Sequence, residues 1–440
     1  MDTRKEIFVL TSALCSIVLL FTALFICPPA FAKTTYYFVR QDAPDNQGVP
    51  NGNPKNPDDC WQTISKAFAD LVTNEGGTLE GKGKFIIQVQ DTETYTESVT
   101  LGGLTTTAND TLTLRKAPDL NGRPTIDATR KSGEAIKITT IAYLTIEGFE
   151  LKTDQNVGNR QYRVLWANQT GLNEGLLTIR DNVFDGQGAG NDPLGQCALL
   201  QVMPMRIDCI ISKNEFKNFY DDDDSCPLLS VYTDTSGGEP VSPPEVIISD
   251  NLFHDNRTNV VIYNSDDYEH TSIIERNLIY NNRCPSTSPL SWGGIISFHF
   301  TDGLMVVRNN LVYNNDWSHL SNRGAVYCMN SDNKKIYNNT LYNNKASTGE
   351  IHVDATSNVG IEVKNNIIWP IPDGSYCIYL EPGAQKDFTS ANNCFYADFN
   401  NDANYKVAND VVGHWAGADE TTSDGTLSRR TAATSITTRC

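Results

Sequence analysis

Two histidines, a tyrosine and an aspartate lie at alternate positions of three strand-like segments, IISFHF, AVYCMN and EIHVDA. These residues are His299, Tyr327, His352 and Asp354. Alternate residues of a β-strand point to the same face, so the four side chains are predicted to share one surface. A tyrosine and a histidine can act as base and acid in proton transfer. With Arg323 from the adjacent loop, or a calcium ion, to neutralise a carboxylate, the set would suit β-elimination or epimerisation of a uronide.

The same surface extends to aromatic and amide residues elsewhere in the chain. The prediction that these side chains point outward depends on six alternate residues pointing inward, which are Ile296, Phe298, Val326, Cys328, Ile351 and Val353. This alternation turns outward the candidate substrate-binding residues Trp166, Tyr232, Asn264 and Tyr379, together with Asn168, Ser297 and Glu381. Aromatic rings and polar groups suit the apolar faces and hydroxyl edges of sugars. A slip of one residue would turn all of them inward. The alternative is an ordinary solvated face, since tyrosine is common in strands.

An acidic run in a predicted loop could bind metal. It consists of Asp221, Asp222, Asp223 and Asp224. Calcium takes several oxygen ligands, so this loop could hold a calcium ion. A run of like charges is otherwise a solvated loop, and both interpretations stay open. Calcium is the one cofactor for which the sequence offers candidate ligands in this way.

A repeat supplies the elements that would position these residues. One asparagine recurs in eight segments, at Asn182, Asn214, Asn251, Asn277, Asn310, Asn339, Asn366 and Asn393. An apolar residue stands two positions after each, and an aliphatic one stands three positions before all but the last. This alternation predicts two strands joined by a bend at the asparagine, and the period of a few tens of residues is that of a solenoid. We expect the asparagines to adopt the left-handed conformation and to stack into an amide ladder.

The repeat predicts an all-β fold. The intervals contain no long helical stretch, which excludes a doubly wound α/β fold. The prediction is a parallel β-helix of roughly ten coils with strands about 4.8 Å apart. In such a stack Tyr327 and His352 are neighbours one coil apart, and His299 and Asp354 share a column two coils apart. Long loops, among them DGQGAGNDPLGQ and NRCPSTSPLSWGG, would overhang this face and wall a groove for an extended polymer.

The repeats, including NNLVYNN and KNNIIW, resemble the right-handed parallel β-helix repeats of the pectin lyase-like superfamily. YYFVRQDAPDNQG followed by CWQTISKAFADL is similar to the opening segment of secreted members, and TYTESVTL and LTIEGFEL are similar to their first coils. The resemblance implies a single-stranded right-handed parallel β-helix with a short N-terminal capping helix. One face of that helix would carry Ile64, Ala67, Phe68 and Leu71.

Two classes of function remain open. The catalytic signatures of well-known superfamily members, such as N-T-D with G-H-G and R-I-K, or W-I-D-H, are absent. No catalytic residue can therefore be carried over from the family. The leading hypothesis is a secreted protein acting on an extracellular acidic polysaccharide as a lyase, epimerase or hydrolase. The alternative is a non-catalytic, surface-associated module that binds glycans or a partner through the same face.

Charge and cysteine content limit the partners. The net charge is −18, and no basic stripe is present, which argues against a nucleic-acid partner. Nine of the 11 cysteines follow the first 32 residues, without the spacing of a zinc site. Cys209 and Cys328 stand where the repeat requires apolar residues, so we expect them in the core. The mature protein is expected to be a monomer.

The chain divides into four predicted parts. Residues 1–32 read as a signal peptide, with an apolar run at 7–26 and the cleavage pattern Ala30-Phe31-Ala32; an uncleaved membrane anchor is the alternative. Cleavage would leave a secreted or cell-surface protein without a membrane span. A strand and capping helix at 33–80 precede the β-helix at 81–396. The segment 397–440 is predicted to be an irregular tail, truncated or disordered.

Overall fold

The computed structural model describes residues 33–407 except 45–46, 130–132, 153–162, 169–170, 188–197, 204–205, 221–226, 234–242, 267–269, 286–292, 300–302, 319–323, 355–358, 371–375, 382–387 and 396–404. The predicted signal segment and the tail beyond 407 lie outside these residues. Among the residues described, no helix has the length and apolarity needed to cross a membrane.

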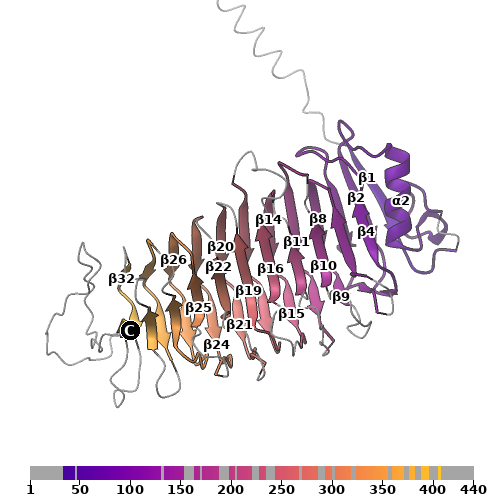
Figure 1. Ribbon diagram of the computed structural model, residues 1–440. Coiled ribbons are helices and arrows are strands. Elements are labelled where there is room, and N and C mark those ends of the chain that lie inside the picture. Colours follow the sequence, from indigo (N-terminus) through magenta and orange to yellow (C-terminus); the bar gives the residue numbers. More distant parts are fainter. Residues whose placement is uncertain are drawn as a thin grey trace, which may run out of the picture.

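Three parallel sheets wind around one core, so the predicted right-handed parallel β-helix is confirmed (Figure 1). Sheet 1 has the order β1 (Thr34–Val39), β2 (Lys84–Val89), β5 (Leu112–Lys116), β8 (Tyr143–Glu147), β11 (Leu176–Arg180), β14 (Asp208–Ser212), β17 (Glu245–Ser249), β20 (Thr271–Glu275), β23 (Met305–Arg308), β26 (Lys334–Tyr337), β29 (Glu362–Lys364) and β32 (Thr389–Ala391).

Sheet 2 carries the predicted site. Its order is β4 (Val99–Gly102), β7 (Ile136–Thr139), β10 (Arg163–Asn168), β13 (Ala198–Val202), β16 (Pro227–Thr233), β19 (Val260–Asp266), β22 (Ile296–His299), β25 (Gly324–Met329), β28 (Gly349–Val353), β31 (Tyr376–Leu380) and β34 (Tyr405–Val407). Each coil passes from a strand of this sheet to one of sheet 1 and then to one of sheet 3, as in β10, β11 and β12 (Val183–Asp185).

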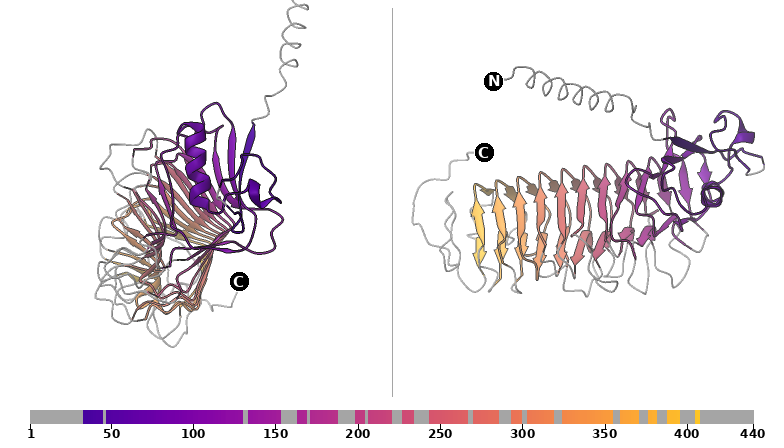
Figure 2. Two further views of the ribbon diagram at one scale, coloured as in Figure 1. Left: turned by 90° about the vertical axis from the view of Figure 1, so that its right-hand side faces the viewer. Right: turned by 90° about the horizontal axis from the view of Figure 1, so that it is seen from above.

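Sheet 3 is built from shorter strands. They are β3 (Thr94–Tyr95), β6 (Thr125–Asp127), β9 (Glu150–Lys152), β12, β15 (Glu215–Lys217), β18 (Leu252–His254), β21 (Leu278–Tyr280), β24 (Leu311–Tyr313), β27 (Thr340–Tyr342), β30 (Ile367–Trp369) and β33 (Cys394–Phe395). Successive coils therefore stack along one axis, as Figure 2 shows from above.

The core is a set of columns in which equivalent residues of successive coils stack. The rings of Phe184, Phe216 and Phe253 lie nearly parallel, with centroids 4.7 and 4.6 Å apart. The six residues predicted to point inward on sheet 2 are all fully buried, as are Cys209 and Cys328. Burial raises the pKa of the Cys209 thiol to about 12, which keeps it a neutral apolar group.

The predicted amide ladder is present, but its conformation differs from the prediction. Each Nδ2 donates to the Oδ1 of the next asparagine, and the distance is 3.0 Å from Asn277 to Asn310 and from Asn310 to Asn339. The residue with positive φ is the one before the ladder asparagine, such as Asn309 at 57°. The left-handed residue makes the bend, and the asparagine after it turns inward to satisfy the buried backbone.

A second ladder, which the sequence analysis missed, runs through Asn256, Asn282, Asn315 and Asn344. Glu350 ends it, because its carboxyl oxygens accept hydrogen bonds from the Asn344 N–H and from Asn344 Nδ2 at 3.2 and 2.7 Å. Glu350 is fully buried among apolar residues such as Ile351. Desolvation raises the pKa of this carboxyl to about 7, although the two hydrogen bonds from Asn344 oppose the shift.

The predicted capping helix is confirmed as α2 (Ile64–Glu75), which packs against β1, β2 and β4. It begins at Thr63, whose side chain accepts a hydrogen bond from the Lys66 N–H, and ends at Gly76 in the left-handed conformation. The four residues expected on its apolar face are buried. Viewed along the axis in Figure 2, α2 lies across the end of the stack and covers the first coils.

Candidate functional site

Two columns of side chains project from the outer face of sheet 2. Column 1 contains, in register, Lys137, Trp166, Gln201, Ser230, Tyr263, Ser297, Tyr327, His352 and Tyr379. Column 2 contains Tyr232, Ser265, His299 and Met329, and continues with Asp354 and Glu381 just after their strands. The predicted neighbours Tyr327 and His352 are thus one coil apart, and His299 and Asp354 share a column.

Five rings form one continuous row on this face, which we call the Tyr–His row. Its edge-to-face contacts have centroid separations of 5.3 Å for Tyr263–His299, 5.6 Å for His299–Tyr327, 5.1 Å for Tyr327–His352 and 5.0 Å for His352–Tyr379. His299 comes from column 2, and the small side chain of Ser297 leaves room for its ring between Tyr263 and Tyr327 in column 1. Edge-to-face contacts stabilise aromatic pairs beyond burial alone and hold the rings in fixed orientations.

Each of two ring residues in the row is hydrogen-bonded to a carboxylate of column 2. The Tyr327 hydroxyl donates to Asp354 Oδ2 at 2.8 Å, and His352 Nε2 lies 3.1 Å from Glu381 Oε1. Tyr327 and His352 are 2% and 0% exposed, whereas the Glu381 side chain is 24% exposed. The carboxylates are therefore the accessible members of these pairs, and the ring residues hold them in place from below.

The contact with Glu381 fixes the chemistry of His352. A carboxylate accepts a hydrogen bond, so Nε2 carries the hydrogen and Nδ1 keeps its lone pair when the imidazole is neutral. His352 Nδ1 is buried and has no hydrogen-bond partner. The two hydrogen-bonded pairs thus place an imidazole, a phenol and two carboxylates on three adjacent strands, which suffices for acid–base catalysis.

The other end of column 1 has a positive character. Two cations lie over the Trp166 ring. Lys137 Nζ is 4.6 Å and the Arg163 guanidinium carbon is 4.8 Å from the ring centroid. Arg163 also lies 4.0 Å from Glu134, so one acidic group partly offsets the two cations. Trp166 Nε1 and Gln201 Oε1, neighbours in register, are buried without a hydrogen-bond partner. An indole donor and an amide acceptor side by side could bind one sugar hydroxyl.

The predicted direction of Asn264 is wrong. Asn264 pairs in register with the inward residue Phe298 and is fully buried, and Tyr263 takes the outward position instead. Inside the core its Nδ2 donates to Ser272 Oγ at 2.7 Å, and Ser272 Oγ also lies 2.8 Å from His270 Nε2. These polar partners allow an amide to occupy an inward position, so alternation of apolar residues could not reveal it. Asn264 therefore does not lie on the outer face of sheet 2.

The remaining candidate residues lie partly on the outer face and partly outside the described residues. Tyr232 and Tyr379 lie on the outer face and are partly exposed. Arg323 and the acidic run, Asp221, Asp222, Asp223 and Asp224, lie outside the described residues, as do residues 188–196 and 286–292 of the loops predicted to wall a groove. Among the residues that the structure does describe, no group of three or more His, Cys, Asp or Glu side chains could hold a metal ion.

The sequence analysis missed Tyr263, Lys137, Arg163 and Gln201 on this face, whereas three glycines mark rings that it did predict. A Cβ on Gly294 would lie 2.9 Å from the Cβ of Tyr327, and one on Gly324 would lie 2.9 Å from the Cβ of His352. A Cβ on Gly349 would lie 3.3 Å from the Cβ of Tyr379. A glycine at the same position of each coil thus gives room to a ring of the next coil. In the sequence, Gly294, Gly324 and Gly349 each stand three residues before a residue of column 1, which is Ser297, Tyr327 or His352.

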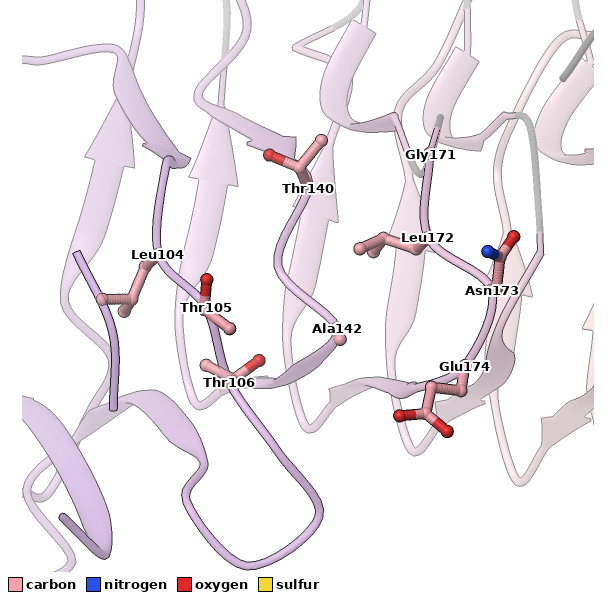
Figure 3. A pocket seen from close by; sticks show the side chains of 9 residues that line it. All are labelled: Leu104, Thr105, Thr106, Thr140, Ala142, Gly171, Leu172, Asn173 and Glu174. Atoms are coloured by element: carbon pink, nitrogen blue, oxygen red, sulfur yellow. The ribbon is translucent and has the colours of Figure 1, made fainter. Parts of the chain in front are cut away.

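A pocket of about 560 Å³ lies away from the Tyr–His row. Figure 3 shows that it is lined by the segments 104–106, 140–142 and 171–174, which follow β4, β7 and β10. Its lining combines threonine hydroxyls and the amide of Asn173 with the apolar side chains of Leu104 and Leu172. Glu174 is the one ionisable group among the lining residues, so the pocket offers no acid–base pair. This pocket is therefore separate from the candidate site on the outer face of sheet 2.

Comparison with known proteins finds distant likenesses among solved structures. No family model and no curated protein matches the sequence. The structure of the GH136 lacto-N-biosidase from Eubacterium ramulus has 11% identity and a TM-score of 0.42, covering 82% of this chain and 68% of that one. The A-module of the mannuronan C-5 epimerase AlgE4 from Azotobacter vinelandii has 11% identity and a TM-score of 0.33, covering 86% and 100%.

Proposed function

We propose that the protein acts on an extracellular polysaccharide through the outer face of sheet 2, with Asp354 and Glu381 as the catalytic residues. The observation that carries the proposal is the pair of parallel contacts, Tyr327 to Asp354 and His352 to Glu381, on adjacent coils. Each accessible carboxylate is held by a nearly buried ring residue. Tyr327 and His352 are then positioning residues, together with His299, which packs edge-on against Tyr327.

Two carboxylates on neighbouring strands favour hydrolysis over the other reactions. Strands lie about 4.8 Å apart, and carboxyl groups about 5–5.5 Å apart are typical of glycosidases that retain configuration. One carboxyl would protonate the leaving oxygen while the other attacks the sugar, and water would then release the product. Elimination or epimerisation would instead require a positive group beside the substrate carboxylate, for which Arg323 or a calcium ion at the acidic run remains the proposal.

The positive end of the face supports an acidic substrate. Lys137 and Arg163 flank Trp166, six strands from His352, or about 29 Å at the strand spacing. A chain of carboxylated sugars along the helix axis could place a carboxylate there and its cleaved bond at Glu381. Tyr232, Tyr263 and Tyr379 would provide apolar contacts. The signal-like first segment supports the proposal that this occurs outside the cell.

A second candidate is a glycan-binding module without catalysis. It is favoured by the burial of His352 and Tyr327, since a stack of buried rings also serves to stabilise the coils. In this case the face would bind the polymer through Trp166, Tyr232 and Tyr379 and leave it intact. The two candidates differ in one measurable respect, which is whether a covalent bond of the polymer is broken.

The test is incubation of the protein beginning at Lys33 with pectate, alginate and glycosaminoglycans, each with calcium and with a chelator. We expect new reducing ends on at least one polymer, without the ultraviolet absorbance of unsaturated uronides. A calcium-dependent rise in that absorbance would make the reaction an elimination. If neither signal appears on any polymer while the protein still binds one of them, the binding module replaces the enzyme.

A further inference from the structure

A second surface, on sheet 3, carries aromatic side chains that the site on sheet 2 does not use. Strands β21, β24, β27 and β30 bury their middle residues and turn the first and third outward. The eight outward residues, which we call the tyrosine face, are Leu278, Tyr280, Leu311, Tyr313, Thr340, Tyr342, Ile367 and Trp369. None of them is charged.

This lack of charge contrasts with two earlier strands of the same sheet. The equivalent outward residues of β9 and β15 in the same sheet are Glu150, Lys152, Glu215 and Lys217. These four form ion pairs within their own strands, Lys152 with Glu150 and Lys217 with Glu215. Sheet 3 thus changes along its length from a charged surface to an apolar one. In a chain with a net charge of −18, an uncharged patch favours an uncharged partner as its occupant.

The tyrosine face presents two kinds of apolar group in parallel rows. The rings of Tyr280 and Tyr313 stack with centroids 5.3 Å apart, and Tyr342 meets Trp369 edge-to-face at 4.9 Å. Leu311 and Ile367 in the aliphatic row are 41% and 45% exposed, which places them among the most exposed large apolar residues described. Each coil adds one ring and one uncharged side chain, which is aliphatic in three coils and Thr340 in the fourth, so the surface repeats at the strand spacing of about 4.8 Å.

A row of amides borders the rings. Asn281, Asn314 and Asn343 directly follow Tyr280, Tyr313 and Tyr342, and each has a left-handed backbone, with φ of 54°, 54° and 52°. Asn281 and Asn314 are exposed, and Asn343 Nδ2 donates to Asn314 Oδ1 at 2.9 Å. Rings with amides beside them at the same period match the apolar faces and hydroxyl edges of consecutive sugars.

We propose that the tyrosine face binds an uncharged polysaccharide chain lying along the helix axis. A second copy of the protein is the less suitable occupant, because eight side chains are far fewer than the roughly 20–30 residues per partner of a stable protein interface. A neutral glycan needs no ion pairing and can use a narrow strip, since each sugar meets one coil. This site is separate from sheet 2 and holds whether or not that face is catalytic.

The test is retention on insoluble cellulose, chitin and mannan, measured as loss of protein from the supernatant. We expect the wild type to bind at least one of them and the double variant Tyr313→Ala/Tyr342→Ala to bind it about ten-fold more weakly, or about 1.4 kcal/mol. Tyr337→Ala, which removes an outward tyrosine on sheet 1, is the matched control and should bind like the wild type. His352→Ala, on sheet 2, should also retain binding.

A second variant covers the case in which loss of two stacked rings disturbs the fold. Leu311→Lys keeps every ring and places a charge on the tyrosine face, at a residue that is already 41% exposed. It should lose binding to the same degree and keep the wild-type melting temperature. The proposal is overturned if the wild type binds none of the three polymers, or if both variants bind normally. It is also overturned if sedimentation shows a dimer that Leu311→Lys dissociates, because the occupant would then be a second copy.

Discussion

Replacing Asn310 with glycine is expected to lower the free energy of unfolding by at least about 4 kcal/mol. Asn310 Oδ1 accepts hydrogen bonds from the N–H and Nδ2 of Asn277. Its Nδ2 donates to the Ile274 carbonyl and to Asn339 Oδ1. Removing the side chain takes these partners from the Asn277 N–H and the Ile274 carbonyl, at about 1–3 kcal/mol each, and also opens a cavity.

The neighbouring asparagine provides the control. Asn309 has a φ of 57° and makes the bend, a conformation that glycine adopts without strain. Asn309→Gly should therefore change stability by only a few tenths of a kcal/mol. Thermal and urea unfolding of the two glycine variants, followed by circular dichroism, would check the pair. Equal destabilisation by both would mean that the ladder contributes no more than the bend.

Replacing Glu350 with glutamine is expected to raise the stability of the protein relative to the wild type as the pH rises from 4.5 to 7. Burial raises the pKa of this carboxyl to about 7, from an ordinary value of 4.5. Between these two values the folded state holds a proton that the unfolded state has lost, so stability falls as the pH rises from 4.5 to 7. Above pH 7 the carboxylate is buried and charged, which destabilises the fold by up to about 3 kcal/mol.

In a measurement on the wild type only, the titration of His270 would hide the effect of Glu350 on stability. Burial lowers the pKa of His270 to about 3 from 6.5, so its contribution makes stability fall as the pH drops below 6.5. The two slopes oppose each other between pH 4.5 and 6.5. The quantity to measure is therefore the difference in unfolding free energy between Glu350→Gln and wild type. It should grow from pH 4.5 to pH 7; a difference independent of pH would show that Glu350 stays charged.

The sequence predicts the repetitive parts of this molecule because each coil repeats the same physical requirements. Neighbouring buried amides, such as those of Asn277 and Asn310, need one another as hydrogen-bond partners, and the apolar face of α2 needs a sheet to cover, so both are visible as patterns in the sequence. Tyr327 and His352 were found on neighbouring strands by alternation alone. The same alternation could not show that Asp354 and Glu381, just beyond their strands, are the accessible partners.

The errors arise where alternation fails. Val261 and Ile262 are consecutive and both buried, because the chain turns a corner there and both N–H groups bond to the Ile295 carbonyl. Glu350 occupies the equivalent corner of a later coil, so a residue that alternation turns outward points inward. Asn264 is inward because of Ser272, which lies on the next strand along the chain and cannot be recognised as its partner from sequence.

The most direct test of the central claim is the rate of product formation by Asp354→Asn and Glu381→Gln on the polymer that the wild type degrades. Tyr337 and Glu362 form a similar tyrosine–carboxylate contact on sheet 1, so Glu362→Gln is the matched control. Loss of an acid or base typically lowers rates by about 10²–10⁴-fold, and we expect at least a hundred-fold loss for both site variants with none for the control. Site variants that retain the wild-type rate while folded would contradict the assignment of this face as the active site.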